Sequence, residues 1–238
     1  MNHEPKAALI LGVLISLGLI VMGWILGNSA LRFKEYERVV SVKGLSEREV
    51  RADVAVWPIR FSAASQDLTE LYALMESHAR DVQQFLLNSG FKPSEITTAV
   101  PVVTDKYAQQ YGGEGNVALR YTAHQTVTVY THRIDAVRSA QNGLVTLGKK
   151  GIAFGGEEYG QKTEYLFTQL NSIKPVMIEE ATRKAREVAE KFAADSNSQL
   201  GKIKSANQGQ FSIEDRDSNT PYLKKVRVVS TVDYYLSD

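Results

Sequence analysis

The stretch "VMIEEATRKAREVAEKFAADSNSQLGKI", Val176 to Ile203, decides the fold because the pattern of a long helix passes here into the pattern of a strand. Small and apolar residues recur three and four positions apart, which predicts a helix with a narrow apolar stripe packed on a sheet or on another helix. The residues of this predicted stripe are Ile178, Ala181, Ala185, Val188 and Phe192.

The charges of this helix are balanced, with four basic and four acidic residues between Glu179 and Lys191. Five oppositely charged pairs stand four residues apart, and each exposed pair of this kind adds about 0.2 to 0.5 kcal/mol to helix stability. The pairs are Glu179 with Arg183, Glu180 with Lys184, Arg183 with Glu187, Arg186 with Glu190, and Glu187 with Lys191. A nucleic-acid-binding helix would carry excess positive charge, and a coiled coil would need a longer repeat. We therefore interpret the stretch as a structural helix with a solvated face, and we expect no nucleic-acid partner.

On the N-terminal side, alternating stretches at residues 38–44 and 49–63 predict two strands, with "LSER", Leu45 to Arg48, as the turn between them. Pro58 lacks an N–H, so we expect an edge or a bulge at that position of the second strand. Residues 67–90 then predict a helix. Asp67 with Glu70 resembles a capping box, and Gly90 with Pro93 closes the helix.

The remaining patterns complete the order ββαββαβαββ. Extended stretches at 95–107 and 117–132 flank a glycine-rich hairpin tip, a second helix covers 133–147, and a short strand covers 162–170. After the helix of the opening stretch, extended segments at 202–213 and 224–236 flank a polar loop. This order predicts an α+β fold, with helices packed on a largely antiparallel sheet, as one domain over residues 31–238.

The segment before this domain predicts a membrane contact. Residues 7–27, "AALILGVLISLGLIVMGWILG", carry no charge and only one hydroxyl, that of Ser16. As a helix they reach about 30 Å, the thickness of a hydrocarbon core. Their length favours an uncleaved anchor, which we assign to residues 1–30. The alternative is a removed signal peptide with a poor cleavage site within Gly27 to Ala30.

The orientation is open on charge alone. Counting Lys and Arg on the two sides of the segment places the large domain in the cytoplasm. However, long domains translocate largely regardless of charge, and an apolar segment this close to the N-terminus commonly acts as an export signal. We therefore expect export of the large domain, with the apolar segment either kept as a single-pass anchor or removed as a signal.

No catalytic constellation is recognisable. The chain contains no cysteine, which removes thiol nucleophiles, disulfides and cysteine metal sites. "GLVTLGKK", Gly143 to Lys150, has the glycine and lysine spacing of a phosphate-binding loop, but it ends a helical pattern and has Lys150 where a hydroxyl should stand. "DRDSN", Asp215 to Asn219, begins like a calcium loop but has Thr220 at the glycine position, so a polar hairpin turn is favoured.

The four histidines are scattered. We expect His78 to be a partly buried structural residue on the first long helix. His124 and His132 share a predicted strand at a separation of roughly 26 Å, too far apart for one metal ion. We therefore predict no catalytic, cofactor-binding or metal-binding residue, and no cofactor.

Two stretches carry a resemblance to the SIMPL-domain family. "VSVKGLSEREVRADVAVWPIRFSA", residues 40–63, is similar to its strand, glycine turn and second strand, and "EEATRKAREVAEKFAADSNSQLGKI", residues 179–203, to its long helix before a Leu-Gly pair. The resemblance runs from about Val39 onward. Family members often have proline where this chain has Ala52, so the start of the second strand is expected to differ.

The resemblance implies an exported bacterial envelope protein, single-pass in the inner membrane with its C-terminal domain in the periplasm, or cleaved and soluble there. Some members of the family form large ring-like homo-oligomers, and links to oxidative-stress tolerance are suggested for the family, with no established catalytic residue. Our first hypothesis is a membrane-anchored scaffold or interaction module that assembles with itself. Apolar strands with Pro58, Tyr234 and Tyr235 are candidates for self-pairing edges, and packing in the core explains them equally well. A second hypothesis is a hydrolase using carboxylates brought together by the fold, with a cleft framed by the loops near Tyr111 to Gly115 and Asp215. A third is binding of a small ligand or peptide on the sheet face.

Overall fold

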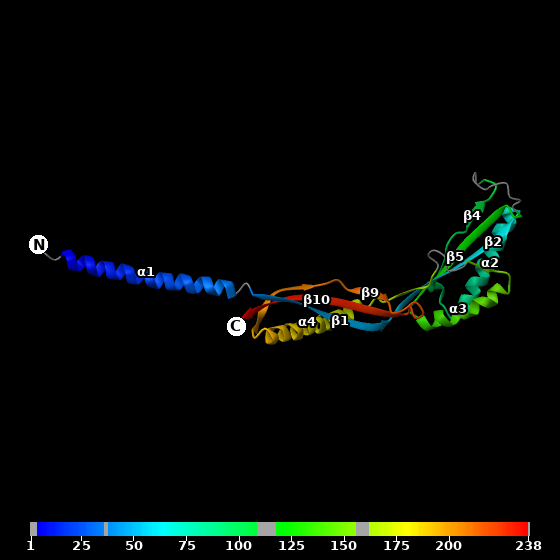
Figure 1. Ribbon diagram of the computed structural model, residues 1–238. Coiled ribbons are helices and arrows are strands. Elements are labelled where there is room, and N and C mark those ends of the chain that lie inside the picture. Colours follow the sequence, from blue (N-terminus) through cyan, green and yellow to red (C-terminus); the bar gives the residue numbers. More distant parts are fainter. Residues whose placement is uncertain (1–3, 36–37, 109–117, 156–161, 238) are drawn as a thin grey trace. The chain divides into compact units, whose positions relative to one another are not determined.

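The protein is described by a computed structural model that covers residues 4–35, 38–108, 118–155 and 162–237. Its fold is α+β, as predicted, with four α-helices and antiparallel sheets in the described residues (Figure 1). The chain forms two compact units. Unit 1 contains Met1–Arg48, Ile173–Ser212 and Arg227–Asp238, and unit 2 contains Glu49–Ser172 and Ile213–Val226. The domain boundary at residue 30 and the single domain over 31–238 stay predictions.

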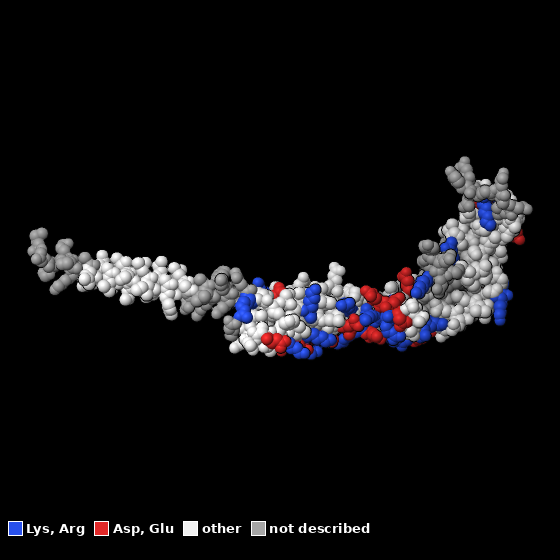
Figure 2. Space-filling model, in the orientation of Figure 1, with Lys and Arg blue, Asp and Glu red and all other residues white. Residues whose placement is uncertain are grey.

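The first helix, α1 (Glu4–Glu35), contains the apolar segment. Its Leu9–Gly27 stretch of 19 residues has a mean hydropathy of 2.7 and is exposed along its length. Figure 2 shows no Lys, Arg, Asp or Glu side chain along the middle of this helix. The Ser16 hydroxyl donates to the Gly12 carbonyl at 2.8 Å, so it is satisfied within the helix, as a hydrocarbon environment requires. The helix is compatible with a membrane anchor or with a signal sequence.

Unit 1 is built on a sheet in the order β1-β10-β8. The short strand β9, whose residues 213–215 belong to unit 2, also pairs with β10. The strands are β1 (Val39–Arg51), β8 (Gln199–Gln208), β9 (Ser212–Asp215) and β10 (Leu223–Ser237). The long helix α4 (Leu170–Asp195) packs on this sheet. Gly44 allows the close approach, because a Cβ there would lie only 1.8 Å from the Ala181 carbonyl oxygen and 2.5 Å from the Ala185 nitrogen.

The buried face of α4 differs from the predicted stripe. Ala181 and Ala185 are buried as predicted, but Val188 and Phe192 are 38% and 56% exposed. The buried side chains recur every four residues instead, at Met177, Ala181, Ala185, Ala189 and Ala193. The physical reason is the contact with Gly44, since only small side chains let the helix backbone come this near to the strand. Of the five expected ion pairs, Arg183–Glu187, Lys184–Glu180 and Arg186–Glu190 are formed, at 2.6, 2.8 and 3.0 Å.

The turn predicted at "LSER" is wrong, because β1 continues through it to Arg51 and the corner lies at Ala52 and Asp53. Ser46 is fully buried, and its hydroxyl donates to Glu180 Oε2 of α4 at 3.0 Å. Arg48 also approaches this carboxylate, at 3.6 Å. These contacts with the helix hold a polar, turn-like sequence in an extended conformation.

Unit 2 is built on a second antiparallel sheet, in the order β3-β5-β2-β6, with β4 beside β5 and β7 beside β2. The elements are β2 (Val54–Ser65), α2 (Leu68–Asn88), a 3-10 turn (Pro93–Glu95), β3 (Ile96–Thr98), β4 (Val102–Asp105), β5 (Tyr121–Thr131), α3 (Ile134–Gly148), β6 (Ala153–Phe154) and β7 (Glu164–Leu166). The extended stretch predicted at 95–107 is thus divided into two strands. The predicted hairpin tip, including Tyr111 to Gly115, lies outside the described residues.

Helices α2 and α3 pack on this sheet around a core that includes Phe61, Leu71, Leu86, Val127 and Val137. Half of the capping box predicted for α2 is present, because the Glu70 backbone N–H donates to Asp67 Oδ1 at 2.8 Å. The Asp67 backbone N–H donates instead to the Ser65 hydroxyl at 3.0 Å, and that hydroxyl donates to the Glu70 carboxylate at 2.6 Å. Without the Asp67 side chain the Glu70 N–H would have no partner, because the first N–H groups of a helix are not bonded within the helix.

Pro58 lies in β2 without a bulge, in uninterrupted register with β5 and opposite Thr128. The Arg60 carbonyl accepts a bond from Gly155, on the side of β2 away from β5. Backbone groups two residues apart in a strand point the same way, so the Pro58 nitrogen also faces away from β5. It falls between the parts of β2 that pair with β7 and with β6, where a missing N–H leaves the ladder intact.

Candidate functional site

The corner between β1 and β2 fixes several segments of unit 2 through Asp53. Its carboxylate accepts the backbone N–H of Thr168 at 2.8 Å and the Thr168 hydroxyl at 2.9 Å. Its backbone N–H donates to the Leu166 carbonyl at 2.8 Å, and its carbonyl oxygen lies 2.8 Å from His132 Nδ1. Asp53 therefore holds the ends of β2, β5 and β7 together, which is a structural role.

Ala52, beside it, donates its backbone N–H to the Tyr222 carbonyl at 2.9 Å. A proline at this position has no N–H to donate. Ala52 therefore makes a hydrogen bond that a proline could not make, and this bond fixes the backbone of Tyr222 just before β10.

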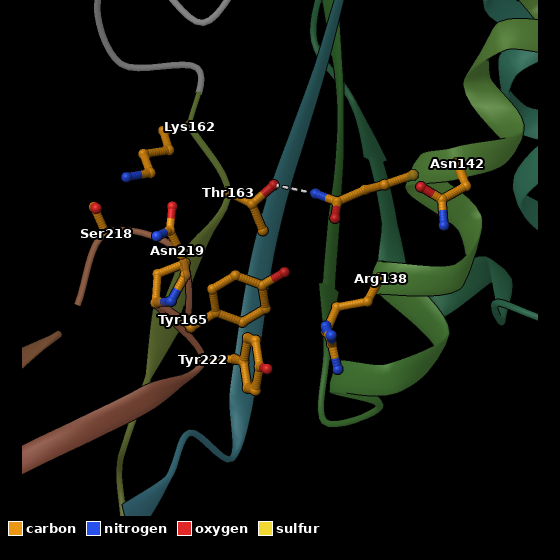
Figure 3. Close-up of a pocket in the computed structure, with 10 residues that line it drawn as sticks. Arg138, Asn142, Lys162, Thr163, Tyr165, Ser218, Asn219 and Tyr222 are labelled. Carbon is orange, nitrogen blue, oxygen red and sulfur yellow. Dashed lines mark hydrogen bonds between the residues drawn. The ribbon is translucent and has the colours of Figure 1, made fainter. Parts of the chain in front are cut away.

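Tyr222 belongs to the lining of a cavity of about 430 Å³ within unit 2 (Figure 3). The cavity is bounded by α3, by the segment that leads into β7, and by the turn between β9 and β10. Its lining residues are Arg138, Gln141, Asn142, Lys162, Thr163, Tyr165, Ser218, Asn219, Pro221 and Tyr222.

The two tyrosines form the aromatic part of this cavity. Their ring centroids lie 6.2 Å apart at an interplanar angle of 75°, an edge-to-face arrangement. The Arg138 guanidinium carbon lies 4.1 Å from the centroid of Tyr222, which is a cation–π contact. Tyr165 is 6% exposed, and burial raises the pKa of its phenol, while the charge of Arg138 opposes the shift.

The remaining lining is polar. Gln141 of α3 donates to the Thr163 hydroxyl at 2.8 Å and so joins the helix to the segment before β7. Arg138 has a long ion pair of 3.5 Å with exposed Asp135, which makes a shorter bond of 3.0 Å to Arg51. The two charged residues in the lining, Arg138 and Lys162, are both cations. The cavity therefore offers positive charge, amides and hydroxyls to a hydrophilic molecule.

The "DRDSN" stretch forms a polar hairpin turn, as favoured from the sequence. Asp217 Oδ1 accepts the backbone N–H groups of Asn219 and Thr220 at 2.9 and 2.8 Å. Its other oxygen accepts from the Thr220 hydroxyl and from Arg216. Hydrogen bonds from Thr220 first and then from Arg216 lower the pKa of Asp217 from 3.8 to about 2. The carboxylate thus serves the turn itself.

The other sequence motifs fall in structural positions. The phosphate-loop-like stretch is the end of α3 and not a loop between a strand and a helix. His78 is 8% exposed and meets the Phe61 ring edge-on at 6.2 Å, and burial lowers its pKa against the opposing charge of Asp81. His124 lies in β5 and His132 just beyond its end. Within the described residues, no group of His, Asp and Glu side chains has the arrangement of a metal site.

The carboxylates give the hydrolase hypothesis little support. Where the pKa of a described carboxylate is clearly shifted, at Glu95, Asp105, Glu180, Asp217 and Asp233, it is lowered, and hydrogen bonds from neighbouring side chains outweigh burial. A general acid in a glycosidase-like pair needs the opposite, a raised pKa.

Sequence reasoning missed the cavity because its parts are far apart in the chain. Arg138 lies in a helix and Tyr222 beside a turn, and neither belongs to a local motif. The only local signal was the polar loop near Asp215, which supplies Ser218 and Asn219.

Fold and site together define an α+β protein with an N-terminal apolar helix and no recognisable catalytic constellation in the described residues. Comparison with known families places the chain more closely. Residues 40–232 match SIMPL, described as "Protein of unknown function (DUF541)", and the chain belongs to this family. A search of curated proteins finds no match.

Proposed function

We propose that this SIMPL protein is an envelope protein held in the inner membrane by residues 7–27, and that its periplasmic domain assembles into a homo-oligomer that acts as a scaffold or interaction module. Export and anchoring are supported by the exposed apolar Leu9–Gly27 helix. The proposal assigns no catalytic activity to the protein.

The observation that carries the assembly is the edge strand β8. It lies at the end of the sheet order β1-β10-β8, and its side chains are exposed along nearly the whole strand. Such an edge presents backbone donors and acceptors to another strand.

The register shows which groups face outward. Gly209 donates its N–H to the Val229 carbonyl at 2.8 Å, towards β10. Because backbone direction alternates along a strand, Asn207 and Ser205 also face β10, opposite Thr231 and Asp233. The N–H and C=O groups of Ala206 and Gln208 therefore face away from β10, at the edge.

The chemistry of this edge changes along its length. Lysine commonly protects an edge strand from pairing, and β8 carries Lys202 and Lys204 among its first six residues. Its last four residues, Ser205 to Gln208, are uncharged. We place the contact between copies there. Because β1 is the other edge of the same sheet, β8 of one copy set on β1 of the next would give a head-to-tail contact of the kind that closes into rings.

The edges suggested from the sequence are not the ones that support this proposal. Tyr234 is 3% exposed and lies with Tyr235 in β10, the central strand of the unit 1 sheet. Pro58 lies in β2, between β5 and the short strands β6 and β7.

Light scattering of the full-length protein in mild detergent tests the proposal. We expect a discrete oligomer, and we expect Ala206→Pro to reduce its mass, because proline removes an outward N–H and leaves the bonds to β10 in place. Ala206→Ser is the matched control and should assemble like the unaltered protein. A full-length protein that is monomeric, or an Ala206→Pro variant that is folded by circular dichroism and assembles normally, would contradict the proposed interface.

A link to oxidative-stress tolerance, which the family resemblance implies, is the part of this proposal furthest from the structure. Deletion of the gene should lower survival after oxidant exposure, and complementation should restore it. Unchanged survival would remove this part and leave the assembly proposal standing.

A further inference from the structure

We propose that the cavity between α3, β7 and the β9–β10 turn of unit 2 binds a small hydroxylated anion, that is, a sugar carrying a carboxylate or a phosphate. This site is separate from the proposed assembly edge, which lies in unit 1, and it is argued independently of it.

The charge of the lining selects an anion. Arg138 and Lys162 line the cavity, and none of the ten lining residues is acidic. The acid nearest in sequence to Arg138, Asp135, is itself bonded to Arg51 through both carboxylate oxygens, at 3.0 and 3.2 Å. Its 3.5 Å ion pair with Arg138 is long and exposed, so it neutralises little of the guanidinium charge.

The guanidinium is also held in place for recognition. It lies over the Tyr222 ring, whose backbone accepts the hydrogen bond from Ala52, and the Tyr222 ring also meets the Tyr165 ring edge-to-face. In Figure 3, Arg138 extends from α3 towards these rings. A stacked guanidinium keeps its N–H edge available for two parallel bonds to a carboxylate or phosphate.

The rest of the lining suits hydroxyl groups. Asn142 and Asn219 provide both donors and acceptors, and Ser218 adds a hydroxyl. The volume of about 430 Å³ lies in the lower part of the range for small-molecule sites, about 300 to 1,000 Å³. A predominantly polar cavity of this size fits a monosaccharide better than an apolar ligand or a peptide.

Isothermal titration of the full-length protein in mild detergent tests the inference, with glucuronate, glucose 6-phosphate, glucose and inorganic phosphate as probes. We expect at least one of the two sugar anions to bind, and the two distinguish a carboxylate ligand from a phosphate ligand. Glucose should bind about tenfold more weakly or not at all, because it lacks the charge-assisted bonds to Arg138.

Variants connect the binding to the cavity. Arg138→Gln should weaken binding of the sugar anion about tenfold or more. Arg183→Gln removes the same charge at an exposed position of α4 and should leave binding unchanged. Tyr222→Leu should also weaken binding, and Tyr222→Phe should retain it, because the ring and not the hydroxyl supports the guanidinium. Thermal unfolding of each variant confirms that it is folded.

Three results would overturn the inference. The first is that neither sugar anion binds. The second is that inorganic phosphate binds as tightly as glucose 6-phosphate, which would indicate a general anion site. The third is that folded Arg138→Gln binds as well as the unaltered protein. None of these results depends on the oligomeric state, so they are distinguishable from failure of the assembly proposal.

Discussion

Gly44 lies where β1 meets α4, and the space beside it is filled by helix backbone. A methyl group at this position would lie 1.8 Å from the Ala181 carbonyl oxygen, so Gly44→Ala must displace the helix. We expect the free energy of unfolding to fall by about 1 to 3 kcal/mol or more, as for overpacked cores. Urea unfolding followed by circular dichroism measures this change.

Gly148→Ala is the control for that substitution. Nothing lies within 4 Å of a Cβ at Gly148, which ends α3. Alanine should be neutral there, or stabilising by up to about 1 kcal/mol. Equal effects of the two substitutions would contradict the close contact between β1 and α4.

Asp217 gives a prediction about pH at the same scale. Its pKa of about 2 in the folded protein lies below its ordinary value of 3.8, chiefly because of the Thr220 hydroxyl and then Arg216. A lowered folded pKa means that the carboxylate contributes stability above about pH 4, and that this contribution is lost as the pH falls through about 2. Carbon-13 NMR titration of the Asp217 carboxyl should show a midpoint near 2.

Thr220→Val should raise that midpoint towards the ordinary value, because valine cannot donate the hydrogen bond. Asp233 serves as an internal control, since its pKa is lowered by Ser205 and Ser41, which are untouched by the substitution. An unchanged Asp217 midpoint in Thr220→Val would show that the hydroxyl does not hold the turn.

At the scale of elements, substitutions in α4 test whether its buried face is the one in the structure or the stripe predicted from the sequence. Phe192 is 56% exposed, so Phe192→Ala should lower the free energy of unfolding by less than about 1 kcal/mol. A buried phenylalanine would cost about 3 to 5 kcal/mol on the same change. Denaturant unfolding decides between these values.

The comparison substitution on the same helix is Ala189→Leu. Ala189 is fully buried beside β1 and β10 residues, so the larger side chain should destabilise the protein by about 1 to 3 kcal/mol. A larger loss for Phe192→Ala than for Ala189→Leu would support the stripe suggested by the sequence.

Elements with a strong local signal could be predicted from the sequence, and elements determined by tertiary contacts could not. Helix α2 has a regular apolar pattern and its own Asp67 cap, and its predicted bounds agree with Leu68–Asn88. "LSER" has the residues of a turn but stays extended because Ser46 and Arg48 bind Glu180, more than a hundred residues away. In α4, spacing alone could not show that Gly44 would select alanines over Val188 and Phe192.

The same limit applies to the candidate site. The residues near Asp215 predict a polar turn, and no catalytic motif is recognisable along the chain. The cavity is lined by Arg138, Tyr165 and Tyr222, which come from separate parts of the chain, and the Tyr222 backbone is bonded to Ala52 from yet another part. Contacts between residues this far apart in the chain leave no local pattern in the sequence.

At the scale of the whole molecule, the apolar part of α1 predicts membrane association. The full-length protein should stay with membranes after alkaline carbonate washing, because Leu9–Gly27 is long enough to span the hydrocarbon core. Gly18→Arg, in the middle of this stretch, should weaken insertion, because a central arginine costs about 2.5 to 3.5 kcal/mol. Fractionation followed by intact-mass spectrometry measures both location and cleavage.

The control is Gly148→Arg, which adds the same charge at an open position of α3. This variant should fractionate like the unaltered protein. If the intact mass of the unaltered protein corresponds to a chain that begins after Gly27, and the protein is in the soluble fraction, the segment is a removed signal and not an anchor.

The order of the unit 1 sheet has a consequence for the chain as it is made. In that sheet β1 pairs with β10, and every element from β2 to β9 is synthesised between these two strands. In unit 2, β2, α2 and β5 follow one another closely and can meet early. The growing chain therefore presents β1 without its sheet neighbour until β10 has been made, so the strand that follows α1 completes its backbone pairing only at the end of synthesis.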